Sequence, residues 1–185
     1  MGMAYKNFWS LNVDEAVTIG MLRGYLSKNL EVFMPANAQM KDIDFIIVNM
    51  KNKKMITVQV KGSRAYEPKE SEVRKFGDGS AGWFHLNKNK IDKSNADFFI
   101  FLIYVLEENK KIGRISIRNH MIVIPTNKLK MLCKKYKKVV KGKIYNFFIW
   151  INPIKKRAIE FRDRKYYMTR YLDEKGLKNL YNRLK

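Results

Sequence analysis

The chain has 185 residues, a length that suits a single domain with its own hydrophobic core. Hydrophobic residues make up 46% and aromatic residues 13% of the chain, which excludes a disordered composition. The single cysteine, Cys133, excludes an intramolecular disulfide and a cysteine-rich zinc site. Lys and Arg number 38 against 17 Asp and Glu, and the formal net charge of +21 predicts a polyanionic partner.

The positive charge is concentrated in the second half of the chain. Residues 1–92 carry 14 basic and 10 acidic side chains, whereas residues 93–185 carry 24 and 7. This asymmetry favours nucleic acid as the partner, double-stranded DNA above all, with an anionic membrane surface second. The longest apolar run, residues 98–106, is too short to span a bilayer, and residues 1–10 lack the apolar core of a signal peptide. We therefore expect no membrane association and a cytoplasmic location.

The first 82 residues predict a helix, a β-hairpin and a long polar loop. Apolar residues spaced by three and four indicate the helix, and apolar runs with alternation indicate the strands. A polar stretch with glycines indicates the loop. In chain order these are a helix over residues 14–29 with the stripe Ile19, Leu22 and Leu26, strands over 43–49 and 54–61 joined by 50–53, and a loop over 62–82.

The rest of the chain predicts strands interspersed with helices. Residues 96–106 are almost continuously apolar, as expected of a strand buried on both faces. The other expected elements are strands over 83–86, 114–118, 121–124 and 144–151, a helix capped by Thr126 with the stripe Leu129, Leu132, Cys133 and Tyr136, and a C-terminal helix with Leu177, Leu180, Tyr181 and Leu184. This order predicts an α/β fold with a mixed central sheet flanked by helices. We expect a single domain over residues 1–185, with a motif core over about 14–125 and a basic part over about 126–185.

Four polar side chains in the first half could form a metal-dependent catalytic site. Asp44 opens the first hairpin strand, and Gln59 and Lys61 share one face of the second strand because they are two residues apart. Glu15 is in line with the predicted buried stripe of the first helix, where a carboxylate is costly unless it is paired or binds a cation. Such oxygen groups suit Mg²⁺, and Lys61 could orient the attacking water in phosphodiester hydrolysis. The predicted metal ligands are Glu15, Asp44, Gln59 and the backbone carbonyl of Val60.

This pattern resembles the PD-(D/E)XK nuclease superfamily. Its hallmark is an aspartate at a strand start, an acid-x-Lys motif on the paired strand and often a glutamate on the first helix. The matching residues are Asp44, Gln59-Val60-Lys61 and Glu15, and the run from Ile56 to Ser63 is similar to the Q-x-K variant of certain homing endonucleases. The resemblance covers roughly residues 14–64, and Trp83-Phe84 and residues 97–104 resemble continuations of the same fold. It implies a restriction-endonuclease-like fold and Mg²⁺, with Mn²⁺ as a substitute.

Two departures and two alternatives accompany this resemblance. Isoleucine replaces the usual proline before Asp44, and Gln59 replaces an acid, which removes one negative charge from the metal site. Glu15 could instead complete a capping box with Asn12, and Asp42 competes with Asp44 as the metal ligand. Gln59 and Lys61 alone would be ordinary strand residues, and only their conjunction with the carboxylates predicts a nuclease site.

Two basic segments in the second half could contact nucleic acid. The first contains a block of lysines without an intervening acid, for which a solvated helix face is the alternative. The second is interleaved with Tyr166 and Tyr167, which could stack on sugars or unpaired bases or belong to the core. His85 and His120 lack nearby ligand partners in the sequence, so we expect them to be structural or DNA-facing. The predicted nucleic-acid-binding residues are Arg64, Lys134, Lys135, Lys137, Lys138, Arg162, Arg164 and Lys165.

These observations predict a Mg²⁺-dependent DNA endonuclease of the homing, restriction or junction-resolving type. The alternative is a catalytically inactive nucleic-acid-binding protein of the same fold, and a weaker third interpretation is cleavage of RNA. We expect a homodimer or a higher homo-oligomer, because one site per chain must cut two strands.

Overall fold

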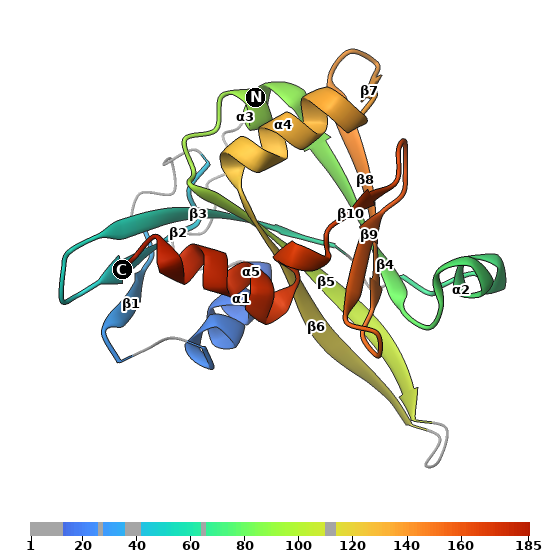
Figure 1. The fold of residues 1–185 in the computed structure, drawn as a ribbon, viewed down its shortest axis with the longest axis horizontal. Helices are drawn as coiled ribbons and strands as arrows, with labels where there is room; N and C mark the ends of the chain where they lie inside the picture. Colours follow the sequence, from blue (N-terminus) through green and yellow to red (C-terminus); the bar gives the residue numbers. More distant parts are fainter. Residues whose placement is uncertain (1–12, 26–27, 36–41, 64–65, 110–113) are drawn as a thin grey trace, which may run out of the picture.

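The computed structural model of the protein describes residues 13–25, 28–35, 42–63, 66–109 and 114–185. These residues form a mixed α/β fold with two β-sheets, which we call sheet A and sheet B. Figure 1 shows α1 (Val13–Arg23) and α5 (Asp173–Asn182) on one side of sheet A, and sheet B with α4 (Thr126–Tyr136) on the other. The prediction of a mixed sheet flanked by helices is confirmed at this level.

Sheet A is mixed and carries the predicted hairpin. Its strands lie in the order β1-β2-β3-β5-β6, and all neighbours are antiparallel except β3 and β5, which are parallel. Parallel neighbours need a crossover, and here the crossover contributes the first strand of sheet B. The strands are β1 (Leu30–Phe33), β2 (Phe45–Asn49), β3 (Met55–Gly62), β5 (Phe98–Asn109) and β6 (Arg114–Pro125).

Sheet B is antiparallel and joins the two halves of the chain. Its strands lie in the order β10-β9-β8-β4, and β7 pairs with β8. They are β4 (Ser80–Asn87), β7 (Val139–Val140), β8 (Ile144–Asn152), β9 (Arg157–Glu160) and β10 (Tyr166–Tyr167). The short helices are α2 (Glu70–Phe76), α3 (Lys88–Asp92) and the one-turn η1 (Thr169–Tyr171). Because β4 pairs with β8, the predicted motif core and the basic part share one sheet.

Strand β5 separates two hydrophobic cores. Every side chain from Phe98 to Ile103 is 2% exposed or less, as predicted for a strand buried on both faces. Phe99, Phe101 and Ile103 pack against sheet B and α4, whereas the alternate side chains pack with α1 and α5. Helix α2 covers part of the outer face of sheet B through a third, smaller cluster. The chain is therefore layered around one strand that has no solvent-facing side over these six residues.

Several predicted elements differ in extent from the observed ones. The first helix ends at Arg23, where a glycine follows, and the predicted loop over residues 62–82 contains α2 and the start of β4. The strands predicted over 114–118 and 121–124 are one strand, β6. Thr126 does not cap α4, because its hydroxyl is buried without a hydrogen-bond partner. Strands β1, β7, β9 and β10 were not predicted.

The inward stripe of α1 also differs from the predicted one. Of the predicted stripe, Leu22 is buried, Ile19 is half-buried and Leu26 lies outside the described residues. Thr18 is fully buried, and its hydroxyl donates a 2.7 Å hydrogen bond to the carbonyl of Asp14. The line that faces the sheet is therefore Asp14, Thr18 and Leu22, at a spacing of four, and Glu15 lies beside this line.

Asp14 fixes α1 against the ends of β3 and β5. The Tyr104 hydroxyl donates a 2.7 Å hydrogen bond to Asp14 Oδ1. Burial, assisted by this bond, raises the pKa of Tyr104 to about 12. The Asp14 carboxylate also lies directly over the Cα of Gly62, and a Cβ at that position would overlap it. Only glycine therefore permits this approach of helix to strand.

We expect Gly62→Ala to destabilise the protein by about 1–3 kcal/mol, because the added methyl group must displace Asp14 and α1. Gly20→Ala is the matched control, because Gly20 lies on α1 itself and has nothing within 4 Å of its Cβ position. It should stabilise the protein by about 0.5–1 kcal/mol through helix propensity. Urea unfolding measures both variants. Equal stability of Gly62→Ala and the wild type would contradict the packing of Asp14 on Gly62.

Candidate active site

The hairpin of β2 and β3 brings Asp44 and Gln59 into direct contact. Asp44 precedes β2, and its amide donates a 2.8 Å hydrogen bond to the carbonyl of Val58 on β3. Asp44 Oδ2 accepts hydrogen bonds from the Gln59 side-chain amide and from the Val60 backbone amide, both at 2.6 Å. The predicted juxtaposition of these residues is therefore present, and it is fixed by two bonds to one carboxylate oxygen.

The groups predicted to ligate a metal converge at this contact. The nitrogen of the Gln59 amide lies 2.6 Å from Asp44 Oδ2 and 3.4 Å from the Val60 carbonyl oxygen. Gln59 is only 6% exposed, so its amide is confined to this position. A rotation that exchanged the amide nitrogen and oxygen would bring three oxygen atoms together around one point, and oxygen donors are what Mg²⁺ prefers.

Lys61 lies on the same face of β3 as Gln59, and its environment is strongly charged. The two residues pair in register with Phe101 and Phe99 of β5, whose side chains face sheet B and α4. Burial lowers the pKa of the Lys61 ammonium from its ordinary value of 10.5. The negative charges of Asp44, Asp42 and Glu15 act in the opposite direction, and the positive charge of Lys90 adds to the lowering. The Lys61 ammonium therefore lies within the electrostatic influence of the candidate carboxylates, and burial makes its charge costly there.

Helix α1 contributes Glu15 to the surroundings of the site. Glu15 is half-buried, and its charge reaches Lys61, as does that of Asp42. Both alternatives for the acidic ligand set therefore lie in the neighbourhood of Lys61. Asp44 is the carboxylate that contacts Gln59 and Val60 directly. Asn12, with which Glu15 could form a capping box, lies outside the described residues.

Most of the oxygen groups that could ligate a cation at this site are neutral. Among the described residues, no three His, Cys, Asp or Glu side chains gather closely enough to hold a metal ion. The converging groups are one carboxylate, one amide and one backbone carbonyl, with Glu15 on the adjacent helix. Such a set fits Mg²⁺ bound partly by water, at lower affinity than a site with two contacting carboxylates.

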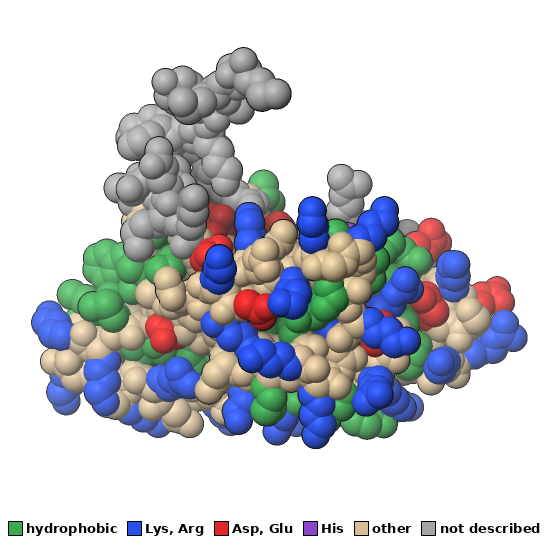
Figure 2. Space-filling model, turned by 90° about the horizontal axis from the view of Figure 1, so that it is seen from above, with side chains coloured by type: hydrophobic (Ala, Val, Ile, Leu, Met, Phe, Trp, Pro, Cys, Tyr) green, Lys and Arg blue, Asp and Glu red, His purple; other side chains and the backbone are tan. Residues whose placement is uncertain are grey.

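The first basic segment lies on α4 and the residues that follow it. Lys134, Lys135 and Lys138 are exposed, and a shallow hollow is bordered by Asn127, Lys130, Met131, Lys134 and Lys135. Figure 2 views the side on which α3, α4 and β7 lie, and basic side chains outnumber acidic ones there. Because α4 packs on the face of sheet A to which Gln59 and Lys61 also belong, the lysines and the candidate site lie on the same side of sheet A.

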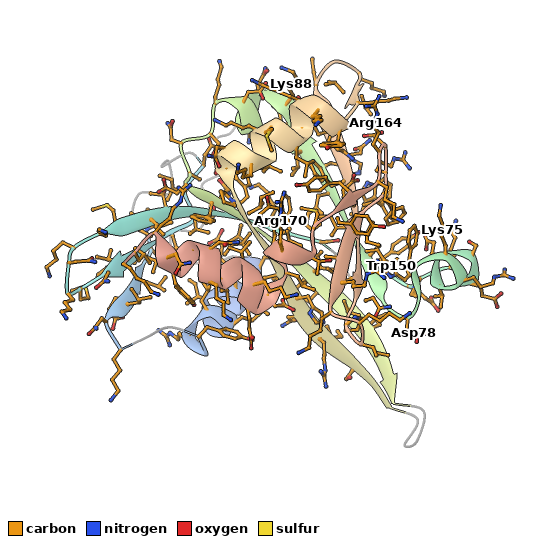
Figure 3. The ribbon with its side chains drawn as sticks, in the orientation of Figure 1. Lys75, Asp78, Lys88, Trp150, Arg164 and Arg170 are labelled. Carbon is orange, nitrogen blue, oxygen red and sulfur yellow. The ribbon has the colours of Figure 1, made fainter. Side chains whose placement is uncertain are left out.

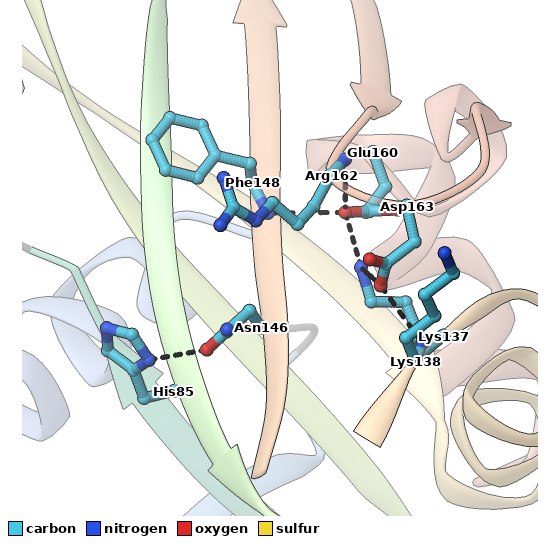
Figure 4. A network of polar contacts seen from close by, with 8 residues as sticks. All are labelled: His85, Lys137, Lys138, Asn146, Phe148, Glu160, Arg162 and Asp163. Atoms are coloured by element: carbon cyan, nitrogen blue, oxygen red, sulfur yellow. Dashed lines mark hydrogen bonds and ion pairs between the residues drawn. The ribbon is translucent and has the colours of Figure 1, made fainter. Parts of the chain in front are cut away.

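Lys137 does not belong to this basic surface, which corrects the prediction. Its side chain is completely buried, and its ammonium lies 2.8 Å from Glu160 Oε1 and 3.1 Å from Asp163 Oδ2 (Figure 4). It also lies 4.6 Å from the centroid of the Phe147 ring. An apolar stripe and a run of lysines cannot distinguish this lysine from its neighbours, because its partners come from residues more than 20 positions away.

The Lys137 network joins the two basic segments. Glu160 Oε1 also accepts hydrogen bonds from the backbone amides of Phe148 and Arg162, and Asp163 accepts one from the backbone amide of Lys138. Burial tends to raise the pKa of Asp163, but the Lys138 amide and the Lys137 ammonium outweigh it and lower that pKa. The loop that follows β9 is thereby fastened to the end of α4.

This arrangement leaves three predicted nucleic-acid contacts exposed on the second segment. Arg162, Arg164 and Lys165 all face solvent in the loop between β9 and β10, and Figure 3 shows Arg164 on the side where α4 ends. Tyr167 is 51% exposed, with the Lys165 ammonium 5.1 Å from its ring. Arg64, the remaining predicted contact, lies outside the described residues.

The two histidines have different surroundings. His120 Nδ1 lies 2.8 Å from Asp173 Oδ2, and the other oxygen of Asp173 accepts the backbone amide of Met121. This pair fastens the start of α5 to β6 and is structural. His85 is exposed on β4, where its Nδ1 lies 2.6 Å from Asn146 Oδ1 (Figure 4).

Four residues around the site were not predicted from the sequence. Asp14 and Tyr104 fasten α1, Ser63 accepts a 2.9 Å hydrogen bond from the backbone amide of Trp83, and Lys90 acts on Lys61. A signal existed for Asp14 alone, because Thr18 follows it by one helical turn. Tyr104 meets Asp14 only through the packing of α1 on β5, and Ser63 and Lys90 depend on the path of β4; the sequence specifies neither.

Comparisons with known proteins add no assignment to this geometry. A scan against models of protein families gives no match, and searches of curated proteins and of solved structures likewise give none. Within the described ranges, no helix has the length and apolar character needed to cross a bilayer.

We expect Lys137→Met to lower the free energy of unfolding by about 3–5 kcal/mol, because it leaves Glu160 and Asp163 without their buried counter-charge. The matched control replaces Lys134, Lys135 and Lys138 by Ala together. These side chains are exposed, so each replacement should change stability by no more than about 0.5 kcal/mol. The triple variant should instead reduce the salt dependence of DNA binding, by up to about 0.9 in log–log slope for each lost phosphate contact. Urea unfolding and salt-dependent binding isotherms distinguish the structural role of Lys137 from the DNA-binding role of the exposed lysines. A Lys137→Met protein that is as stable as wild type and binds DNA with a reduced salt slope would contradict this assignment.

We expect Lys61→Met to leave the stability unchanged or to increase it near neutral pH. Because burial lowers the pKa of Lys61, the folded state holds this proton less tightly than the unfolded chain does. The charged lysine therefore reduces stability below its folded-state pKa, and this cost disappears as the pH rises towards the unfolded value of 10.5. Urea unfolding of both proteins at several pH values should show a difference that shrinks with rising pH. A variant clearly less stable than wild type at pH 7 would contradict this environment.

Proposed function

We propose that the protein is a metal-dependent DNA endonuclease of the PD-(D/E)XK type. The observation that carries this proposal is the contact of Asp44 with Gln59 and Val60 at 2.6 Å, next to a half-buried Lys61 on which the charges of Asp44 and Glu15 act. Asp44, Gln59 and Val60 are in direct contact, and Glu15 is connected to them through the effect of its charge on Lys61. Phosphodiester hydrolysis needs oxygen ligands for a cation and a positive group near the attacking water, and the cluster contains both kinds of group.

The arrangement of the strands supports a restriction-endonuclease-like core. The antiparallel hairpin of β2 and β3 carries the motif, and β5 continues the sheet in parallel with β3. Helix α1 packs across the ends of β3 and β5 through Asp14 and carries Glu15, whose charge acts on Lys61. These are the elements on which the resemblance of the sequence depends.

Asp44, Gln59, the Val60 carbonyl and Glu15 would hold the cation. Bound Mg²⁺ would polarise the phosphate and lower the pKa of the attacking water. The backbone amide of Val60 orients the Asp44 carboxylate through a 2.6 Å hydrogen bond. Lys61, placed two residues beyond Gln59 on the same face, would orient the water and offset negative charge in the transition state.

The basic segments would hold the DNA. Lys134, Lys135 and Lys138 on and after α4 lie on the same side of sheet A as Lys61, and Arg162, Arg164 and Lys165 are fastened to the end of α4 by the Lys137 network. Phosphate contacts of this kind position the duplex without reading its sequence. Cutting both strands with one site per chain favours a homodimer or higher homo-oligomer as the active form.

One observation favours a second candidate, an inactive nucleic-acid-binding protein of the same fold. The Gln59 amide satisfies the Asp44 carboxylate directly, so this pair is stable without any cation. An acid at position 59 would repel Asp44 and would need a cation between them. Substitutions of Gln59 therefore distinguish the two candidate functions.

We expect Asp44→Ala and Lys61→Ala each to reduce Mg²⁺-dependent or Mn²⁺-dependent cleavage by about 100-fold or more, with DNA affinity nearly unchanged. The matched controls are Asp78→Ala and Lys75→Ala, which remove exposed charges on the α2 side of sheet B (Figure 3). Cleavage of a random-sequence DNA library, together with branched junctions, is the appropriate assay because the target sequence is unspecified.

Substitutions at Gln59 complete the same experiment. Gln59→Glu should bind Mg²⁺ more tightly by calorimetric titration and retain cleavage, because it restores a charged ligand. Gln59→Ala should bind the metal more weakly and cut far less, with partial rescue by Mn²⁺. Absence of cleavage by the wild type over all substrates and both metals would favour the inactive candidate.

A further inference from the structure

The outer face of sheet B is only partly covered. Ala81, Phe148 and Trp150 form a small cluster with Tyr66 and residues of α2, which closes one end of this face. Towards the other end, β4 alternates between buried and exposed residues, and Trp83 is 44% exposed. The cover provided by α2 therefore ends where Trp83 begins.

Trp83 and His85 form a continuous aromatic surface at this uncovered end. Their ring centroids are 4.7 Å apart, and the Trp83 ring also lies 5.3 Å from that of Phe148 on the neighbouring strand. The contact of His85 with Asn146 holds the imidazole in place across the two strands. A half-exposed tryptophan packed on a fixed imidazole differs from a core aromatic, because its remaining ring surface faces solvent in a defined orientation.

The strand that carries this surface passes beside the candidate active site. The Trp83 amide donates to Ser63 Oγ at 2.9 Å, and Ser63 lies two residues beyond Lys61, or roughly 7 Å along the chain. At the other end of β4, Lys90 of the following helix acts electrostatically on Lys61. Trp83 and His85 therefore lie on the strand that passes alongside the site.

A basic side chain, Arg162, lies near the aromatic surface, and its charge is complementary to a nucleic acid strand. The Arg162 backbone amide and that of Phe148 donate to the same Glu160 oxygen, so exposed Arg162 adjoins the neighbouring strand of this face. Aromatic rings beside basic groups are the combination that binds unpaired nucleotides, because every base has a face that can stack. A paired base in a duplex has both faces covered by its neighbours and cannot use such a ring.

We infer that Trp83 and His85 form a base-stacking surface for an unpaired nucleotide of the DNA strand bound at the neighbouring site. This inference rests on the proposed nuclease function and specifies its substrate class. The preferred DNA contains a short unpaired segment, at a junction, flap or bulge, next to the bond that would be cut. Uninterrupted duplex lacks the base that this surface accepts.

Fluorescence tests the stacking directly, because the two described tryptophans differ sharply in exposure. Trp150 is 1% exposed and Trp83 is 44% exposed, so removing the third tryptophan with Trp9→Phe leaves Trp83 as the accessible one. In this background, with Asp44→Ala to prevent cleavage, a bulged duplex should quench the fluorescence, whereas a fully paired duplex of the same sequence should quench it much less. Equal quenching by both DNAs, or none by the bulged one, contradicts the inference.

Affinity measurements provide the second readout. Trp83→Ala should weaken binding of the bulged duplex by about 5- to 100-fold and leave the paired duplex unchanged, whereas Trp83→Phe should retain most of the preference. Phe33→Ala is the matched control, because Phe33 is 48% exposed on β1 at the far edge of sheet A. Circular dichroism confirms that each variant is folded, and His85→Ala serves as a second variant if Trp83→Ala is not.

The outcomes separate this inference from the proposed function. Cleavage by the protein with a bulge preference that survives Trp83→Ala would overturn the stacking surface and leave the nuclease intact. Trp83-dependent binding of bulged DNA without cleavage by the wild type would support the surface and contradict the nuclease. Loss of affinity for both DNAs on Trp83→Ala would overturn the inference, because it would show a general contact rather than a stacked base.

Discussion

The burial of β5 on both faces is the constraint on which the rest of the structure depends. Six consecutive side chains, from Phe98 to Ile103, are almost inaccessible, so both faces of this strand must be covered. Helices α1 and α5 cover one face, and sheet B with α4 covers the other. Each cover contributes next to the candidate site, because α1 supplies Glu15 and the Trp83 amide of β4 donates to Ser63, two residues beyond Lys61. Packing around one strand thus determines which groups surround Lys61.

The candidate site lies at the edge of this packing, where burial and charge oppose each other. Gln59 and Lys61 project from β3 towards the same side as Phe99 and Phe101, into a partly desolvated space. The Lys61 ammonium is less stable there than in water, and nearby carboxylates compensate only in part. Proteins commonly retain such unfavourable groups where function needs them, so the cost itself supports a functional interpretation.

Local patterns in the sequence predicted the hairpin and the buried strand correctly. The alternation of Thr57 to Lys61 specifies which side chains share a face, and pairing with β2 then places Asp44 beside Gln59. These relations depend on residues close in sequence or on strict strand periodicity. They are therefore accessible without a structure.

Long-range contacts account for what could not be predicted. Lys137 is one of eight nearby lysines, and only its contacts with Glu160 and Asp163 reveal that it is buried and structural. The predicted inward line of α1 was displaced by one residue from the observed one. The observed line depends on contacts of Asp14 with Gly62 and Tyr104, about 50 and 90 positions away. Sheet B was not predicted as a separate layer, because its pairing of β4 with β8 joins segments more than 50 residues apart.

The most direct test of the account is a crystal structure of the protein with an oligonucleotide duplex that contains a short bulge, in the presence of Ca²⁺ to prevent turnover. The account predicts a cation ligated by Asp44, Glu15, the side-chain oxygen of Gln59 and the backbone carbonyl oxygen of Val60, with a backbone phosphate beside it and near the Lys61 ammonium. It also predicts contacts from the exposed lysines of α4 to flanking phosphates on the same side of sheet A. A complex in which the DNA contacts α4 while the Asp44–Gln59 bond persists and no cation or phosphate lies beside it would contradict the central claim.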